Sequence, residues 1–321
     1  MKLATINDGS RDGILIVVSS DGSRYARPES IATMQAALDN WQEAEPVLQT
    51  LATEVNAGAG RPASDVIFAA PLRRAWQWLD GSAFDSHGEL MQRAFRLDPI
   101  EHDKPLMYQG MSHQFLGPDE DVPFVSEQDG IDFEGEFGVI VDDVPIGSNA
   151  AEAMQHIKLI VQINDWSLRV LAPIEMKTGF GWIQAKPACS VAPFAVTPED
   201  LGDAWQNGRV NLDLDVQRNG KQFGRANGGA MNVGFHELVE HAAATRSLCA
   251  GTIIGSGTVS NPNYREVGSS CIAERRGIEI LDYGEPRTPF MHFGDTVSME
   301  ARRADGGILF GRIEQRVVSV R

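Results

Sequence analysis

Cysteine is scarce in this sequence, acidic residues outnumber basic ones, and long apolar runs are missing. The three cysteines, Cys189, Cys249 and Cys271, lie far apart and form no CxxC pair. This pattern argues against a disulfide framework and a cysteine-bound zinc, and is typical of reduced thiols. Lys and Arg number 28 against 44 Asp and Glu, so the net charge is −16. Such a charge argues against binding to nucleic acid, which is itself a polyanion.

Signals for membrane insertion and export are missing as well. The longest aliphatic run, residues 14–18, is far shorter than the roughly 20 residues that cross a bilayer. Residues 1–5 lack the apolar core of a secretory signal peptide. We therefore expect a cytoplasmic protein with no membrane partner. Its 321 residues suffice for one large domain, alone or with a small one.

Two domains are predicted, a small N-terminal module over residues 1–65 and a main domain over residues 66–321. In the module, apolar runs at 2–6 and 14–18 predict short strands. Apolar residues spaced by three and four predict a helical stretch from about residue 31 to 55, interrupted at Pro46. The boundary is placed in residues 56–65, which are small, flexible and rich in Gly and Pro.

Strands and loops dominate the predicted main domain. Alternating apolar residues over 209–217, followed by Asn219-Gly220, predict a hairpin. A helix is expected at 235–243, and further strands at 277–281, 296–301 and 308–320. The prediction is therefore a strand-rich α+β protein. Residues 101–130 are long and irregular, and we interpret them as a candidate lid.

The segment around Glu134 and Glu136 is the most informative in the chain. Alternate side chains of a strand point to opposite faces, so these glutamates share one face while Phe133 and Phe137 share the other. Two carboxylates about 4 Å apart repel by roughly 4 kcal/mol at an effective dielectric near 20. Solvent at an exposed edge strand, a shared proton, a neighbouring base or a hard cation could offset that repulsion.

Two further acids occupy apolar surroundings. Asp165 closes the apolar run 158–164, and Asp80 follows a tryptophan and a leucine. Each could be a turn or capping residue by itself. Together with the two glutamates they could form an all-oxygen shell, which suits Mg²⁺, Mn²⁺ or Ca²⁺ and disfavours zinc.

A series of motifs in this chain carries a family resemblance. In order, they are Asp80 with His87 seven positions later, Glu134-Gly135-Glu136, Asn164-Asp165-Trp166-Ser167-Leu168-Arg169, Gly255-Ser256-Gly257-Thr258-Val259-Ser260, Gly268-Ser269-Ser270-Cys271-Ile272-Ala273-Glu274 and Phe293-Gly294-Asp295-Thr296-Val297. In this order they resemble the fumarylacetoacetate hydrolase family, over roughly residues 70–321. The resemblance implies a mixed β-roll for the catalytic domain, assembled as a homodimer.

The resemblance also implies which residues bind the metal and the substrate. Four carboxylates would hold one divalent cation, Mg²⁺ or alternatively Mn²⁺ or Ca²⁺: Asp80, Glu134, Glu136 and Asp165. The residues implied in substrate binding are Arg96, Tyr108, Arg169 and Thr258. The buried negative charge that remains needs nearby cations, which Lys186 and Arg169 could supply.

Three residues are implied in catalysis. His87 would be the general base, Glu274 the carboxylate that orients it, and Lys186 the cation that stabilises developing negative charge. From the residues alone, His87 could also be a surface or core histidine and Lys186 a surface lysine. Glu274 could be an exposed partner of Arg275 or Arg276.

The implied reaction is hydrolytic cleavage of a carbon–carbon bond in a 1,3-dicarbonyl or acylpyruvate-type acid resembling fumarylacetoacetate. Water activated by His87 would attack, and the metal would stabilise an enolate. Two departures leave the substrate open, because Ser82 replaces an aromatic residue and Ala172 replaces a glutamine of the fumarylacetoacetase enzymes.

Other activities remain as alternatives. Relatives on the same scaffold decarboxylate oxaloacetate, hydrate 2-oxo-pentenoates or isomerise dienoates. A non-catalytic, metal-dependent protein that binds an oxo-acid is a further alternative. The expected partner is thus a small oxo-acid, in the setting of aromatic-compound breakdown.

Overall fold

Two β-sheets form the body of the protein, whose computed structural model describes residues 1–96 and 104–320. The strands of the larger sheet are, in spatial order, β4 (Arg61–Pro62), β3 (Arg24–Ala26), β2 (Ile14–Val18), β1 (Lys2–Ile6), β14 (Phe194–Val196), β11 (Ile157–Asn164), β10 (Gly135–Val141), β19 (Ile253–Gly255), β6 (Trp78–Gly81) and β7 (Met107–Gly110), with β5 (Phe68–Ala69) on β1 and β13 (Ser190–Val191) on β11. The second sheet has the order β18 (Lys221–Asn227), β17 (Asp213–Arg218), β20 (Thr296–Arg302), β21 (Ile308–Ser319) and β8 (Val122–Phe124).

Short strand pairs and helices surround these sheets. The pairs are β9 (Ile131–Asp132) with β12 (Ser167–Leu168) and β15 (Trp205–Gln206) with β16 (Arg209–Val210). The α-helices are α1 (Met34–Asp39), α2 (Trp41–Asn56), α3 (Asp85–Phe95), α4 (Ala150–His156), α5 (Ala172–Thr178), α6 (Pro198–Leu201), α7 (Phe235–Ala243), α8 (Tyr264–Val267) and α9 (Ile272–Tyr283). The 3₁₀ turns are η1 (Ala63–Asp65), η2 (Glu127–Asp129), η3 (Gly202–Ala204) and η4 (Gly228–Ala230). The fold is therefore strand-rich α+β, as predicted.

The main core lies between the two sheets. The rings of Phe137 and Phe310 pack at 5.8 Å between centroids, joining β10 of the first sheet to β21 of the second. A buried amide also links the sheets, because Gln162 Nε2 donates to Met299 O at 2.9 Å and Gln162 Oε1 accepts from Ala301 N at 2.8 Å. Both polar ends of this glutamine are satisfied, so its burial costs little.

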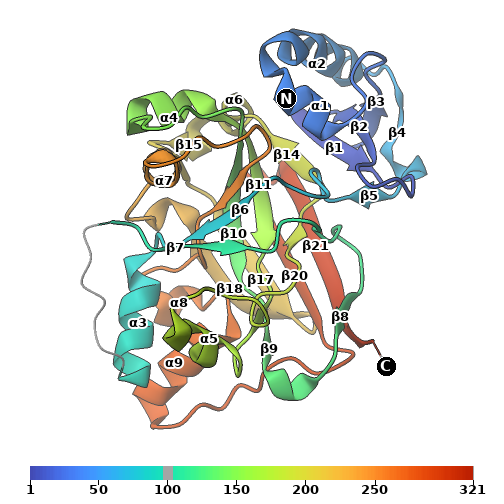
Figure 1. The fold of residues 1–321 in the computed structure, drawn as a ribbon. Coiled ribbons are helices and arrows are strands. Elements are labelled where there is room, and N and C mark those ends of the chain that lie inside the picture. Colours follow the sequence, from blue (N-terminus) through green and yellow to red (C-terminus); the bar gives the residue numbers. More distant parts are fainter. Residues whose placement is uncertain (97–103, 321) are drawn as a thin grey trace.

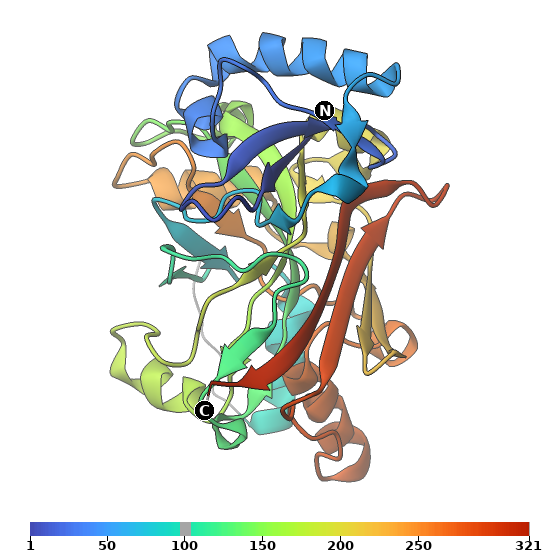
Figure 2. The same cartoon turned by 90° about the vertical axis from the view of Figure 1, so that its right-hand side faces the viewer.

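The N-terminal module shares the larger sheet with the rest of the chain. Strand β1 pairs with β2 on one side and with β14 on the other, so the module extends the sheet. Figures 1 and 2 show helix α2 lying outside these strands, at the end of the molecule remote from α9. The predicted boundary near residue 65 stays a prediction.

Several predicted elements are confirmed. The strands at 2–6 and 14–18 and the helix at 235–243 match β1, β2 and α7. The hairpin β17–β18 turns at Asn219 and Gly220, which both have positive φ, as a tight hairpin turn with this twist requires. The predicted lid, residues 101–130, begins outside the described residues and otherwise contains β7, β8 and η2.

Two predicted elements are wrong. Helix α2 continues through Pro46, and the break falls at Asn40, between α1 and α2. The helix tolerates the missing proline N–H because Trp41, Ala44 and Leu48 anchor it in the core. Residues 277–281 belong to α9, since a short apolar run does not distinguish a strand from a buried helix turn. Within the described residues, none of the helices has the length and apolar character to cross a membrane.

Candidate metal and catalytic site

Sheet topology brings together acids that lie far apart in the sequence. Strand β10 lies between β11 and β19, and β19 pairs in parallel with β6. The register places Gly255 beside Asp80 and Gly135 beside Asn164, the residue before Asp165. Neighbouring strands therefore deliver Asp80, Glu136 and Asp165 to one place in the sheet.

These three acids form a compact buried cluster. One carboxylate oxygen from each of Asp80, Glu136 and Asp165 lies within 4.8 Å of the other two, and the three residues are at most 4% exposed. The alternative of a solvated edge strand is wrong, because β10 is central and buried along its length. We call these three residues the acidic cluster.

Within residues 1–96 and 104–320, one member of the acidic cluster, Glu136, lacks the hydrogen-bond donors that buried carboxylates normally have. Among the described residues, neither oxygen of Glu136 has a donor, whereas Asp80 Oδ1 accepts from Gly257 N at 3.0 Å. Burial, followed by the neighbouring carboxylates, raises the pKa of both Asp80 and Glu136 well above the usual value. Buried, unpaired oxygens of this kind fit a hard divalent cation, which would supply the missing positive charge.

Asp165 is the best-supported member of the acidic cluster. Its Oδ2 accepts from Tyr108 Oη at 2.6 Å and from Lys186 Nζ at 2.5 Å, and its Oδ1 accepts from Cys189 Sγ at 3.0 Å. Burial lowers the pKa of Lys186, but Asp165 and Glu134 raise it by more, so the ammonium stays charged. Lys186 is only 6% exposed, so the surface-lysine alternative is wrong.

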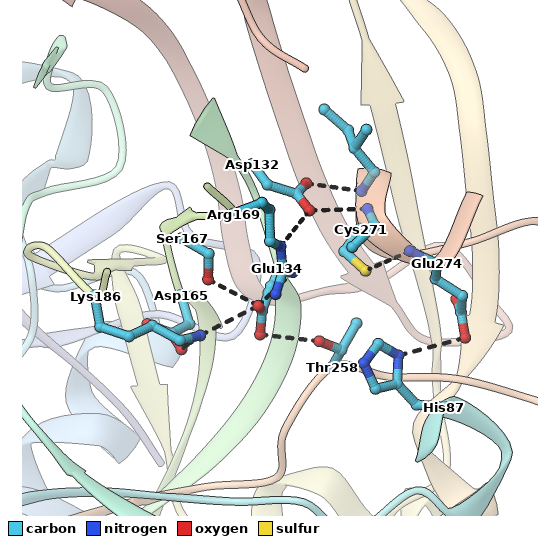
Figure 3. Close-up of polar contacts among 12 residues, drawn as sticks. His87, Asp132, Glu134, Asp165, Ser167, Arg169, Lys186, Thr258, Cys271 and Glu274 are labelled. Atoms are coloured by element: carbon cyan, nitrogen blue, oxygen red, sulfur yellow. Dashed lines mark hydrogen bonds and ion pairs between the residues drawn. The ribbon is translucent and has the colours of Figure 1, made fainter. Parts of the chain in front are cut away.

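Glu134, the fourth predicted ligand, lies outside the acidic cluster. Its Oε1 accepts from Ser167 Oγ at 2.8 Å and from Lys186 Nζ at 3.1 Å, and it forms an ion pair with Arg169 Nη2 at 2.5 Å (Figure 3). Its Oε2 accepts from Thr258 Oγ1 at 3.0 Å. Burial would raise the pKa of Glu134, but Arg169 and Lys186 outweigh it and hold the pKa below its usual value. Three of these four contacts fall on Oε1 and one on Oε2, and the charge of this carboxylate is balanced by the cations of Arg169 and Lys186.

A second buried acid pairs with Arg169. Asp132 Oδ2 accepts from Arg169 Nε at 2.8 Å and from Ala273 N at 2.9 Å, while Oδ1 accepts from Ile272 N at 2.7 Å. Asp132 therefore contacts the first turn of α9, the helix that carries Glu274 (Figure 3).

His87 and Glu274 face each other from two helices. His87 lies in α3, Glu274 lies in α9, and these helices pack side by side (Figure 1). His87 Nδ1 is 3.6 Å from Glu274 Oε1, longer than a hydrogen bond. Glu274 is fully buried, so the alternative of an exposed partner for a neighbouring arginine is wrong.

Serine hydroxyls support this pair. Ser260 Oγ donates to Glu274 Oε1 at 2.5 Å, and Ser86 Oγ donates to Ser260 Oγ at 2.9 Å. Ser86 directly precedes His87 in α3. The two hydroxyls therefore connect the part of α3 that carries His87 to the Glu274 carboxylate in α9. These contacts hold Glu274 within reach of the imidazole.

The remaining predicted residues are more scattered. Thr258 and Tyr108 reach the site, but their hydroxyls donate to Glu134 and Asp165. Arg96 ends α3 in a left-handed conformation, φ 53°, and is exposed. Ser82 is exposed beyond β6, and Ala172 is buried at the start of α5.

The sequence analysis missed several residues that the structure places in the site. They are Asp132, Ser86, Ser167, Cys189 and Ser260. One signal was available, because Asp132 continues the period-two pattern of the two glutamates that follow it. The serines and the cysteine are common in turns and cores, so only their contacts distinguish them.

Comparison with known protein families gives matches along most of the chain. The family model for the fumarylacetoacetate (FAA) hydrolase C-terminal domain matches residues 77–318, and the model for the fumarylacetoacetase N-terminal domain 2 matches residues 1–74. The chain belongs to the fumarylacetoacetate hydrolase family.

One curated relative is named as a hydrolase. A 2,4-didehydro-3-deoxy-L-rhamnonate hydrolase of Sphingomonas sp. is 25% identical over 158 residues, which make up 48% of this chain and 53% of that protein. The chain spans about half the length of the first curated relatives that it matches.

Two solved structures share the fold over the whole of both chains. One is maleylpyruvate hydrolase from Sphingobium sp. SYK-6 in complex with manganese(II) and pyruvate, with a TM-score of 0.68 and 16% identity. The other is 5-carboxymethyl-2-hydroxymuconate delta-isomerase from Mycobacterium smegmatis, with a TM-score of 0.64 and 21% identity. Both hydrolases and isomerases therefore occur on this fold.

Proposed function

We propose that this member of the fumarylacetoacetate hydrolase family is a divalent-metal-dependent hydrolase that cleaves a carbon–carbon bond in a 1,3-dicarbonyl or acylpyruvate-type acid. The observation that carries the proposal is the acidic cluster, in which buried carboxylate oxygens from three strands or strand ends lie within 4.8 Å of one another. Two relatives named as hydrolases, one of them solved with manganese(II) and pyruvate, support it.

Asp80, Glu136 and Asp165 would hold the cation, and Mg²⁺ or Mn²⁺ suits their oxygen donors. When bound, such a cation polarises substrate oxygens as a Lewis acid and stabilises negative charge that develops on them. Glu134 remains a predicted fourth ligand. Its present contacts give it a second role, that of holding Lys186 and Arg169 beside the cluster.

His87 is the proposed general base. It takes a proton from water as the water oxygen bonds to the substrate carbonyl carbon, and the carbon–carbon bond then breaks. The electron pair of that bond passes to the departing carbon as an enolate, which receives the proton back from the imidazole. Glu274, near Nδ1, orients the ring so that Nε2 is the nitrogen that exchanges the proton.

Lys186 and Arg169 supply fixed positive charge beside the reacting atoms. Negative charge that develops on the departing carbon would be stabilised by Lys186, which is buried and therefore acts in a medium of low dielectric. Arg96 is proposed to bind the substrate carboxylate with its forked donors. Tyr108 and Thr258 already donate to carboxylates, so they would meet the substrate as hydrogen-bond acceptors.

A panel of substrates tests the proposal. Acylpyruvates, fumarylacetoacetate and oxaloacetate are each assayed with Mg²⁺, with Mn²⁺ and after chelation. We expect turnover of an acylpyruvate-type acid that chelation abolishes and added metal restores. Specific binding of these acids without turnover would contradict the proposal and favour a binding protein.

Isotope labelling separates hydrolysis from the other reactions of this fold. Reaction in H₂¹⁸O places ¹⁸O in a product carboxylate only if water attacks the carbonyl carbon. Absence of label in the product of an active enzyme would favour isomerisation or decarboxylation, and the similar delta-isomerase structure makes isomerisation the second candidate.

One variant tests the assigned base. His87→Ala is expected to lower turnover by roughly 10²–10⁴-fold, the range for loss of general-base catalysis, while Mn²⁺ affinity persists. Turnover equal to that of the wild type in this variant would refute the assignment.

A further inference from the structure

Asp132 is a buried carboxylate that does not belong to the acidic cluster. It contacts Arg169, which pairs with Glu134, and also the first turn of α9, the helix that carries Glu274. It lies on β9, is fully buried, and both of its oxygens accept hydrogen bonds. Strand β12 pairs with β9 and places Ser167, a donor to Glu134, directly beside Asp132. The strand pairing therefore fixes the backbone of Asp132 next to Glu134 and the acidic cluster.

One set of contacts leads from Asp132 to the cluster side. Arg169 Nε lies 2.8 Å from Asp132 Oδ2, and Arg169 Nη2 lies 2.5 Å from Glu134 Oε1. A guanidinium held by two carboxylates has its orientation fixed, because its planar fork must meet both. Asp132 thus determines where the positive charge of Arg169 lies relative to Glu134 (Figure 3).

The other set of contacts leads to the base. Asp132 accepts from the amides of Ile272 and Ala273, the first two residues of the twelve-residue helix α9. These amides have no partner within the helix, and a negative charge at this end is favoured by the helix dipole. Glu274 is the next residue, so the position of the first turn sets the distance between Glu274 and His87.

We propose that Asp132 is a positioning residue that fixes the His87–Glu274 pair relative to the acidic cluster, an inference that rests on the proposed function. Its carboxylate accepts three hydrogen bonds and donates none. An ionised aspartate can do this because both of its oxygens are acceptors. An asparagine would turn its amide donor towards at least one of the same donors and leave it unpaired.

The test is the variant Asp132→Asn in the full chain, loaded with Mn²⁺. We expect kcat to fall by about 10–100-fold, the usual loss when a residue that orients a metal-site group is changed, while KM and the Kd for Mn²⁺ change little. Hydrogen exchange at the amides of Ile272 and Ala273 should become faster.

Asp295→Asn is the matched control. Asp295 also accepts from an arginine, Arg218, and from a backbone amide, that of His292, but none of its partners belongs to the site. This variant should lose stability and keep kcat. It thereby separates the loss of an Arg–Asp pair from the loss of positioning.

Two results would overturn the inference. One is a wild-type kcat in folded Asp132→Asn; the other is a parallel loss of kcat, Mn²⁺ affinity and thermal stability, which indicates general collapse. Failure of the proposed function is distinguishable, because the wild type would then turn over no oxo-acid. In that case hydrogen exchange still tests the contact between Asp132 and α9. Exchange at Ile272 and Ala273 that is the same in Asp132→Asn as in the wild type would refute that contact.

Discussion

A methyl group on Gly255 would lie 2.3 Å from Asp80 Oδ1, so the glycine is what allows β19 to approach the first acid of the cluster. The same methyl would lie 2.4 Å from Trp78 Cη2. Both groups are buried, and Asp80 Oδ1 is also tied to the amide of Gly257, so neither can move away freely. The absence of a side chain at residue 255 is therefore part of how the site is built.

Gly255→Ala is expected to disturb the acidic cluster directly. Overpacking of this kind costs about 1–3 kcal/mol of unfolding free energy, and Asp80 should shift away from the other two acids. We expect weaker Mn²⁺ binding by isothermal titration calorimetry and a lower thermal midpoint. Gly88→Ala is the control, because nothing lies within 4 Å of a methyl there, and removing a helical glycine should stabilise by roughly 0.5–1 kcal/mol. Wild-type Mn²⁺ affinity in Gly255→Ala would contradict this account of the glycine.

Glu136→Gln should have opposite effects on the metal-free and metal-bound protein. In the metal-free protein the substitution replaces a buried carboxyl that has no donor among the described residues and faces two other acids, so that folding disfavours its charged form and raises its pKa. We expect the unfolding free energy in chelator to rise by about 1–3 kcal/mol. Mn²⁺ affinity should fall on the order of 100-fold or more, because an anionic ligand is lost.

Thermal unfolding with chelator and with added Mn²⁺ measures both effects. The wild type should be stabilised by the metal, whereas Glu136→Gln should respond little. Glu54→Gln, at an exposed position in α2, is the control and should behave as the wild type. A variant that is less stable in chelator and still stabilised by Mn²⁺ would show that Glu136 is not a ligand.

Local patterns predicted much of the fold because strands and turns have short-range signatures. The alternation and the Asn219-Gly220 turn identify the β17–β18 hairpin, and the aliphatic run identifies β2. The same reasoning failed at residues 277–281, because an apolar run of this length fits a strand or a helix turn equally well. It failed at Pro46 because tertiary packing of α2 overrides the local preference of proline.

The convergence of the site could not be predicted from spacing alone. Asp80 lies beside Gly255 through a parallel strand pair whose members are separated by more than half the chain, and no local pattern encodes that pairing. The resemblance to a family supplied it. The resemblance did not distinguish Glu134, whose oxygens face protein donors, from Glu136, whose oxygens have no donor among the residues described.

Lys2 should give the protein a measurable pH dependence in alkaline solution. Its ammonium is buried, donates to Ser20 O and Ile308 O, and burial lowers its pKa to about 8. Between that value and the ordinary one near 10.5, the unfolded chain binds a proton that the folded protein does not. The contribution of Lys2 to stability therefore increases as pH rises through this window.

Comparison with Lys2→Met isolates this contribution. The difference in unfolding free energy between the wild type and the variant should shift in favour of the wild type by up to about 3 kcal/mol between pH 8 and pH 10.5. Guanidinium unfolding at several pH values measures it. Parallel stability curves for the two proteins would show that the lysine is not perturbed by burial.

Ser260, which contacts Glu274, and Ser86, which contacts Ser260, should contribute unequally to stability and turnover. Ser260→Ala removes the donor at 2.5 Å from a fully buried carboxylate whose other oxygen has no donor in the described part of the chain. Loss of a hydrogen bond to a charged group costs about 1.5–3 kcal/mol, whereas Ser86→Ala removes only a hydroxyl–hydroxyl bond, which contributes about 0.5–1.5 kcal/mol. Because Glu274 is then less firmly held near His87, kcat should also fall further in Ser260→Ala than in Ser86→Ala. Guanidinium unfolding and steady-state kinetics of the two variants measure this order, and a larger loss in Ser86→Ala would mean that the hydroxyls act on His87 without Glu274.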